Sequence, residues 1–360
     1  MADDLNIGQE RKIGMSHPCF IVAEIGQNHQ GDINIAKQLI SAAKASGADC
    51  VKFQKSCLVE KFNSAALKRP YLGPNSWGDT YEEHKQFLEF SLDQFRELQE
   101  FATKQEGVMF SASAMDMVSI DELDSMNVPF IKIGSGDANN LPLLKYAASK
   151  KRPLIISTGM QDMSTVRAVY RTVKAAGGQF CLCHCVSAYP TPPQQVNLRV
   201  LDTYRWEFPD IHVGYSGHEL GTAISVAAVA LGARVLERHI TLDKSWKGSD
   251  HVCSLTPDEF KELVNQVRTV ELAIDAILLW TKSWKGSDHI CSLTPEEFKE
   301  LVNQVRTVEL AMGSPVKSFQ PNERPCYNKL GKSVVATRPL PHGHVIRDSD
   351  IIAKVSKDLD

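Results

Sequence analysis

The feature that most constrains the fold of this chain is a regular alternation of short apolar β runs with helical patterns. Eight β runs lie between Cys19 and Thr241, and a further helical pattern follows the last run at residues 256–273. Such alternation gives parallel strands, and a closed barrel of eight units takes roughly 250 residues. We therefore predict an α/β fold, a (β/α)8 TIM barrel, with a doubly wound open sheet as the alternative. The runs are residues 19–26, 48–54, 107–113, 129–135, 152–158, 180–187, 211–218 and 234–241.

The β runs share one pattern: each begins with apolar residues and ends with polar residues at its carboxyl end. In a parallel barrel these ends ring one mouth, where barrel enzymes keep their sites. A single polar strand end is usually a solvated boundary, but the same pattern in all the runs predicts a polar pocket. The residues concerned are Glu24, Lys52, Gln54, Ser111, Ser113, Lys132, Ser135, Ser157, His218 and His239.

Two of these strand ends carry histidines, His218 and His239. Residues 211–241 are predicted to form a strand, helix, strand unit, whose two strands run parallel and end on the same edge of the sheet. The two imidazoles can then share one ion, and Asp250, eleven residues after His239, can join the same site. The alternative is that each histidine is a hydrogen-bonded strand-end residue without a ligand.

Composition narrows the classes of partner. The net charge is −3 and no long basic run occurs, which argues against a nucleic-acid partner. No apolar run approaches the roughly 18 residues of a membrane span, and the first residues lack the apolar core of a signal peptide, so we expect a cytoplasmic protein without a membrane partner. Nine cysteines, an odd number without an export signal, indicate reduced thiols.

The cluster Cys181, Cys183, His184 and Cys185 looks like a metal motif but lies in a predicted strand. Strand alternation sends the three cysteines to one face and His184 to the other. Buried thiols in a packed strand are therefore the favoured interpretation.

A long insertion, residues 56–90, follows the second β run. It is rich in Lys, Arg, Tyr and Trp, and it is long enough to fold over the mouth of the barrel as a lid. The alternative is a surface loop without a role in binding.

One segment of the chain is present twice. Residues 244–273 recur at 282–311. The two copies differ at only two positions: Val252 in the first copy is replaced by Ile290 in the second, and Asp258 by Glu296. The first copy is predicted to close the barrel, because Asp250 follows the eighth strand directly, whereas Asp288 lies beyond a whole helix and a spacer. The second copy then needs another surface for its apolar stripe, which comprises Phe298, Leu301, Val302, Val305 and Val308.

The domain organisation follows from these segments. We predict a barrel over residues 1–273, the second copy with its spacer over 274–311, a linker over 312–327 and a small β module over 328–360. The last module is too short to hold a core alone.

Several long motifs in order make the chain resemble the sialic acid synthase family, and most closely its animal members. They run from AEIGQNHQGD at residues 23–32 through GADCVKFQKS, IKIGSGDANN, SAYPTPP, GYSGHE and LERHITLDKSWKGSDH to LGKSVVA. The resemblance implies a TIM barrel followed by a C-terminal antifreeze-like (SAF) domain that covers the partner's mouth in a homodimer. We expect that β-rich domain to be truncated here. Some relatives place an arginine over the partner's site where this chain has Lys332, a cation without the planar fork of arginine.

The resemblance also implies a reaction. Phosphoenolpyruvate would condense with N-acetylmannosamine 6-phosphate, or with the unphosphorylated sugar, to give N-acetylneuraminate 9-phosphate, or N-acetylneuraminate, and phosphate. A divalent ion, Mn²⁺ or Mg²⁺, held by His218 and His239, would polarise the sugar aldehyde.

Site roles are carried over by position. The residues implied to be catalytic are Glu24 as acid or base, Lys52, Lys132 and Asp250. In the insertion, Lys61, Lys68 and Arg69 supply positive charge, and we expect them to favour a phosphorylated acceptor. The substrate-binding residues expected in addition are Gln54, Ser111, Ser135, Ser157, Ser187, Tyr189 and Lys332.

Two alternative functions stay open at this point. One keeps the phosphoenolpyruvate site but uses another sugar aldehyde, as in related synthases of seven- and eight-carbon keto acids. The other is an inactive or ligand-binding splice form, which the repeat and the short tail suggest and the intact pocket residues oppose.

Overall fold

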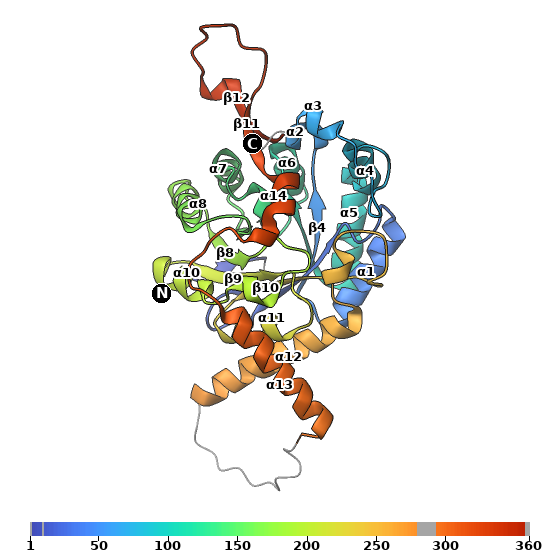
Figure 1. Ribbon diagram of the computed structural model, residues 1–360, viewed down its shortest axis with the longest axis vertical. Helices are drawn as coiled ribbons and strands as arrows, with labels where there is room; N and C mark the ends of the chain where they lie inside the picture. The colour runs from blue at the N-terminus through green and yellow to red at the C-terminus, as the bar shows by residue number, and fades with distance from the viewer. Residues whose placement is uncertain (1, 9–10, 279–292, 357–360) are drawn as a thin grey trace.

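The computed structural model describes residues 2–8, 11–278 and 293–356. Within these residues, eight parallel strands close into a barrel, in which each strand pairs with its neighbours along the chain and β10 pairs with β3. Helices surround the barrel (Figure 1). The predicted (β/α)8 barrel is confirmed, and the open sheet is wrong. The strands are β3 (Phe20–Gly26), β4 (Cys50–Lys55), β5 (Met109–Ala114), β6 (Ile131–Ile133), β7 (Leu154–Ser157), β8 (Phe180–Cys185), β9 (His212–Gly217) and β10 (Val235–His239).

The barrel helices begin where the sequence supplies capping side chains. Asp32 accepts hydrogen bonds from two first-turn amides of α1, and Asp162 caps α8 in the same way. Helix α5 continues into the π-helical segment η1 (Phe101–Glu106), which ends at Gly107 with a φ of 65°, a conformation that favours glycine. The barrel helices are α1 (Ile33–Ala45), α5 (Leu92–Glu100), α6 (Met117–Ser125), α7 (Leu141–Ser149), α8 (Met163–Ala175), α10 (Val200–Glu207), α11 (Ala223–Ala230) and α12 (Pro257–Leu278).

Apolar side chains fill two compartments. The larger one lies between the strands and the helices around them. The smaller one lies inside the barrel, where the first residues of the strands meet Leu5, Ile7 and Ile13 of an N-terminal hairpin, β1 (Leu5–Asn6) and β2 (Lys12–Ile13). This hairpin closes the amino end of the barrel, so the polar strand ends lie at the opposite, carboxyl end.

The cysteine-rich strand β8 behaves as alternation predicts. Cys181 and Cys183 are fully buried in the interior compartment. His184 points to the other face, where its Nε2 lies 2.6 Å from the Val196 carbonyl oxygen. The four side chains therefore do not converge on one metal. Among the described residues, no helix is long and apolar enough to cross a membrane.

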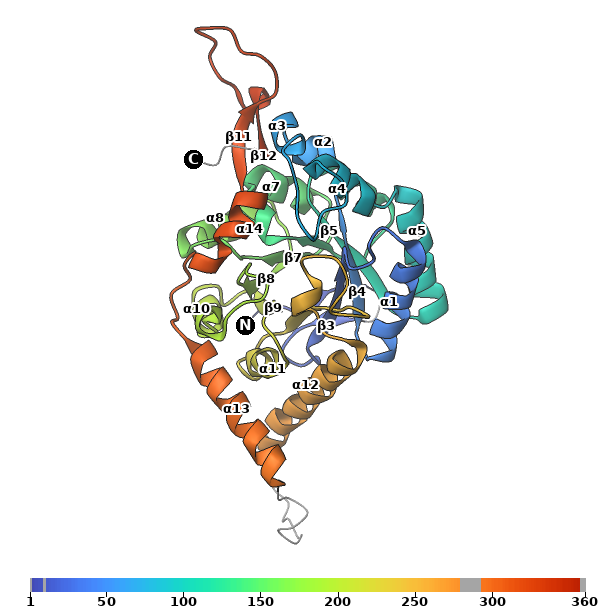
Figure 2. The ribbon, with the colours of Figure 1, turned by 45° about the vertical axis from the view of Figure 1, so that its right-hand side comes forward.

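The insertion at residues 56–90 folds into three short helices. They are α2 (Leu58–Lys61), α3 (Ser64–Leu67) and α4 (Tyr81–Leu88), the last with a capping box formed by Thr80 and Glu83. The insertion has a small apolar core of its own, to which Phe62, Tyr81 and the C-terminal Val355 contribute. It lies beside the carboxyl end of the barrel (Figure 2).

The segment expected to be a linker is anchored across the mouth of the barrel. The Lys317 ammonium donates to the Cys185 carbonyl oxygen at 2.9 Å. The buried carboxylate of Glu323 accepts hydrogen bonds from the amides of Met160 at 2.6 Å and Ser187 at 2.8 Å. These bonds fix the start of α14 (Arg324–Leu330), which lies over the barrel mouth.

The chain after α14 forms a two-stranded antiparallel hairpin, β11 (Lys332–Ala336) and β12 (Ile351–Val355). It joins the insertion through a bridge between Phe62 and Val355 and rises from the barrel beside α2 and α3 (Figure 2). Val334 is 70% exposed, in keeping with a module too small for its own core.

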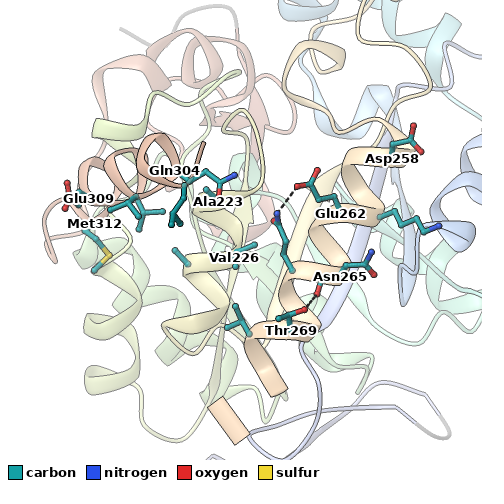
Figure 3. Close-up of a pocket in the computed structure, with 16 residues that line it drawn as sticks. Ala223, Val226, Asp258, Glu262, Asn265, Thr269, Gln304, Glu309 and Met312 are labelled. Atoms are coloured by element: carbon teal, nitrogen blue, oxygen red, sulfur yellow. Dashed lines mark hydrogen bonds between the residues drawn. The ribbon is translucent and has the colours of Figure 1, made fainter. Parts of the chain in front are cut away.

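The two copies of the duplicated segment lie in different places. The helix of the first copy, α12, packs on α1 and α11 and closes the barrel. The helix of the second copy, α13 (Pro295–Met312), packs on α11 and on α9 (Pro193–Val196). An apolar groove separates the two helices over α11 (Figure 3). Asp288 lies outside the described residues.

Candidate active site

The polar strand ends surround a small inner cavity of about 100 Å³ at the carboxyl end of the barrel. The side chains that reach it are inward-facing residues two apart along a strand, as strand geometry requires. Lys52 and Gln54 come from β4, while Glu237 and His239 come from β10.

Two buried ammonium groups form one wall of the inner cavity. Lys52 Nζ donates to the Ser113 hydroxyl at 2.9 Å and contacts the Glu24 carboxylate. Lys132 Nζ donates to the Ser157 hydroxyl at 2.8 Å. Glu237 Oε1 lies 3.6 Å from Lys52 Nζ and 3.5 Å from Lys132 Nζ. Since these distances exceed a good charge-assisted hydrogen bond, both lysines keep donor capacity for an anion.

The two carboxylates in this wall differ in proton affinity. Burial raises the pKa of Glu24 to about 6, although the Lys52 ammonium opposes the rise. Burial acts in the same direction on Glu237, but the charges of Lys132 and Lys52 outweigh it and lower the pKa of Glu237 to about 2. Glu237 is therefore a fixed counter-charge, whereas Glu24 can exchange a proton near neutral pH.

The two imidazoles lie together at the ends of the neighbouring strands β9 and β10. The ring centroids of His218 and His239 are 5.4 Å apart, and the Tyr189 ring lies tilted against His218 with its centroid 4.0 Å away. His218 Nδ1 lies 2.8 Å from the Val186 carbonyl oxygen, which fixes the ring. Buried His239 Nδ1 has no hydrogen-bond partner among the described residues and lies 3.9 Å from Asp250 Oδ2.

The protonation state of His239 suits a metal ligand. Burial lowers the pKa of this histidine to about 3, so the ring is neutral and can offer a lone pair. In the part of the chain that the structure describes, no group of three or more metal-binding side chains converges. The two histidines can thus supply two positions of a coordination shell, and water and substrate would have to supply the others.

A wider outer cavity of about 840 Å³ adjoins the inner one. Gln54, Lys61, Ser187 and Tyr189 line both, so the two cavities are continuous. Asp250 lines the outer cavity. The insertion and α14 form much of the remaining wall, through Lys85 and Lys329 among others.

Most of the residues singled out in the sequence line one of these cavities, and four do not. Ser111 is turned away, with its hydroxyl donating to the Phe130 carbonyl oxygen at 2.7 Å. Lys68 is exposed, and the Arg69 guanidinium lies 4.3 Å from the Tyr81 ring centroid. Lys332 contacts Asp137 and donates to the Met115 carbonyl oxygen at 3.1 Å. The residues that line the inner or the outer cavity are Glu24, Lys52, Gln54, Lys61, Ser113, Lys132, Ser135, Ser157, Ser187, Tyr189, His218, His239 and Asp250.

The sequence reading missed several residues of the site. Ser216 and Glu237 lie two residues before His218 and His239, so extending the strand period by one step would have found them. Lys85 and Lys329 come from α4 and α14, and no strand pattern points to either of them.

A further cavity lies away from the mouth of the barrel. A groove of about 910 Å³ lies between α12 and α13, with Val226 of α11 at its base and Glu262 and Gln304 on its sides (Figure 3). It contains no cluster of converging charges, so the chemistry belongs to the smaller cavities.

The model of the NeuB family matches residues 39–278 and, separately, residues 277–317. The chain is 50% identical over 354 residues to the N-acetylneuraminate-9-phosphate synthase of Homo sapiens. This alignment covers 98% of this chain and 88% of the relative. It is 48% identical over 339 residues to the protein of the same name from Drosophila melanogaster, covering 94% and 87%.

Among solved structures, the spore coat polysaccharide biosynthesis protein spsE from Bacillus subtilis superposes with a TM-score of 0.76. Its sequence identity is 30%, and the alignment covers 98% of this chain and 88% of that one. The N-acetylneuraminic acid synthetase from Leptospira borgpetersenii, solved in complex with citrate, gives a TM-score of 0.67 at 28% identity, covering 85% and 97%.

Proposed function

Because this chain belongs to the NeuB family, we propose that it condenses phosphoenolpyruvate with N-acetylmannosamine 6-phosphate in sialic acid biosynthesis. The products are N-acetylneuraminate 9-phosphate and inorganic phosphate. The human, mouse and fruit fly relatives support this acceptor, since all three are named N-acetylneuraminate-9-phosphate synthases.

The observation that carries the proposal is that two buried ammonium groups, Lys52 and Lys132, line one cavity together with two imidazoles. Phosphoenolpyruvate carries a phosphate and a carboxylate on one small carbon skeleton. Two fixed cations, each oriented by a serine hydroxyl, can hold such an anion with its enol carbon toward the imidazoles. The sugar would then occupy the outer cavity, with its aldehyde toward the enol carbon.

The residues of the inner cavity account for the steps of the reaction. The enol carbon forms a bond to the aldehyde carbon, and water adds to the carbon that bears the phosphate ester. The resulting tetrahedral centre loses phosphate as its carbon–oxygen bond breaks. Glu24, held by Lys52 and by the Gln54 amide at 3.1 Å, can move a proton to or from the reacting oxygen atoms.

We propose that His218 and His239 hold a divalent ion, Mn²⁺ or Mg²⁺. The short distance between the rings and the unpartnered Nδ1 of His239 support this assignment. When bound, the ion supplies Lewis acidity at the aldehyde oxygen. Asp250 Oδ2 lies 3.9 Å from the same Nδ1, so its carboxylate can support the coordination shell of the ion.

An assay of the purified full chain tests the function. Phosphate release from phosphoenolpyruvate should require the sugar phosphate and a divalent metal. His218→Ala and His239→Ala should each weaken Mn²⁺ binding, measured by calorimetry, by at least about 10- to 100-fold, the cost known even for residues that only support metal ligands. The exposed His342→Ala serves as the matched control. Unchanged Mn²⁺ affinity in both variants would remove the metal assignment.

We also propose that the protein is a cytoplasmic homodimer whose C-terminal hairpin belongs to an antifreeze-like domain. Exposed apolar side chains on that part of the chain, Val334 at 70% and Val345 at 77%, support a partner surface there. Sedimentation of the full chain should give a dimer, and a monomer at micromolar concentration would contradict this part of the proposal.

A further inference from the structure

Three lysines from three separate elements line the outer cavity. Lys61 ends α2, Lys85 lies in α4 and Lys329 lies in α14. Lys61 is 4% exposed and Lys85 is 8% exposed, while Lys329 is half-buried. Lysines are almost never buried to this degree unless a counter-charge accompanies them.

The Asp250 carboxylate lines the same cavity, but among the described residues this lysine cluster has no counter-charge at ion-pair distance. Lys61 Nζ has the Met115 sulfur at 2.6 Å, and Lys85 Nζ donates to the Gln27 side-chain oxygen at 2.7 Å. Lys329 Nζ lies 5.5 Å from the Tyr71 ring centroid and 5.9 Å from that of Tyr81. Within the described ranges, none of the three ammonium groups has a carboxylate oxygen within 4.0 Å.

The three charges also act on one another. Burial lowers the pKa of Lys61 to about 8. Burial, together with the charges of Lys329 and Lys61, lowers the pKa of Lys85 well below its usual range. Like charges that share a buried wall destabilise one another, and a bound anion would relieve that repulsion.

We propose that Lys61, Lys85 and Lys329 form the subsite for the 6-phosphate of the acceptor sugar. This inference deepens the proposed function and rests on it. The phosphate of phosphoenolpyruvate has its own cations in Lys52 and Lys132, so the outer lysine cluster serves a second anion. Lys85 and Lys329 line only the outer cavity, and Lys61 lies where the two cavities meet, so the second anion would bind in the outer cavity, beyond the phosphoenolpyruvate site.

The chemistry of the cluster gives it a role in specificity. A phosphate dianion offers three oxygens, which is enough to accept one charge-assisted hydrogen bond from each ammonium group. The unphosphorylated sugar would leave the three charges facing one another and so would bind less well. The cluster should therefore discriminate by phosphorylation state and leave the handling of phosphoenolpyruvate unchanged.

The test compares Lys85→Met and Lys329→Met with two references. Lys85→Arg keeps the charge, and Lys104→Met removes an exposed lysine on the outer face of the barrel, where 72% of the side chain is exposed. With N-acetylmannosamine 6-phosphate, each methionine variant at the cluster should raise KM at least about 10-fold, as expected for a lost charge-assisted hydrogen bond. With N-acetylmannosamine, KM should stay the same or fall. The KM for phosphoenolpyruvate should not change, Lys85→Arg should keep most of the preference, and Lys104→Met should behave as wild type.

An equal loss of efficiency with both sugars would overturn the subsite and leave the proposed function intact. Absence of product from either sugar with the wild-type chain would instead count against the proposed function. Calorimetry with N-acetylmannosamine 6-phosphate, in the absence of phosphoenolpyruvate, measures the affinity of the sugar phosphate for the protein without turnover. Weaker binding in Lys85→Met than in Lys104→Met supports the subsite, and equal binding in the two variants overturns it.

Discussion

Helices α12 and α13 share almost one sequence, yet they have different environments. In α12, Phe260, Leu263 and Val267 are fully buried against the barrel. In α13, the equivalent Phe298 is 59% exposed and Leu301 is 43% exposed. The comparison teaches that the position in the fold, and not the local sequence, decides whether an amphipathic stripe becomes core.

The polar contacts of α12 and α13 differ in the same way as their apolar contacts. The Arg268 guanidinium of α12 donates to the Cys19 carbonyl oxygen at 2.9 Å and to Asp49 at 3.1 Å, so it fastens the helix to the amino end of the barrel. Its equivalent in α13, Arg306, is 70% exposed and pairs with Glu309 in its own helix. The end of α13 is held differently, because buried Ala311 accepts a hydrogen bond from the Leu198 amide at 2.8 Å.

The largest expected difference between the copies is in activity. Asp250 lines the outer cavity beside His239, so Asp250→Ala should lower kcat/KM by about 10- to 100-fold, the range for a residue that supports a metal ligand. Asp288→Ala should leave kcat/KM near wild type. Steady-state kinetics of the two variants decide the matter. An essential Asp288 and a dispensable Asp250 would mean that the second copy supplies the site.

A smaller difference is expected in stability. Leu263→Ala removes a fully buried side chain and should lower the free energy of unfolding by about 2–5 kcal/mol. Leu301→Ala makes the same chemical change in the same local sequence, but on an exposed face, and should cost within about 0.5 kcal/mol. Denaturant unfolding of both variants measures the difference. Equal losses would show that α13 is packed as tightly as α12.

Sequence patterns were sufficient for the barrel because each of its elements obeys its own period. The eight β runs become eight strands, and the three cysteines of β8 alternate with His184 as predicted. The N-terminal hairpin was not predicted, since strands of two residues each leave too short a pattern to recognise. The sequence also did not indicate that hydrogen bonds of Lys317 and Glu323 hold the predicted linker against the barrel, because these bonds join residues far apart in the chain.

The residues of the candidate site also fall into a group that the sequence could predict and a group that it could not. Residues on strand ends, such as Lys52 and His239, could be predicted because parallel strands in a barrel share one mouth. Residues on the insertion and on α14 could not, because their placement depends on tertiary packing. Charge alone favoured Lys68 and Arg69, whereas packing brings Lys85 and Lys329 to the cavity.

Hydrogen exchange of the two helices tests most directly the claim that the first copy, and not the second, completes the barrel. Peptides that contain Asp258 or Glu296 differ in mass by one methylene group, so the two copies can be followed separately in one sample. Amides in the first half of α12 should stay protected far longer than those in the first half of α13, since only the former lie against the core. Equal protection, or slower exchange in the peptide with Glu296, would contradict the account.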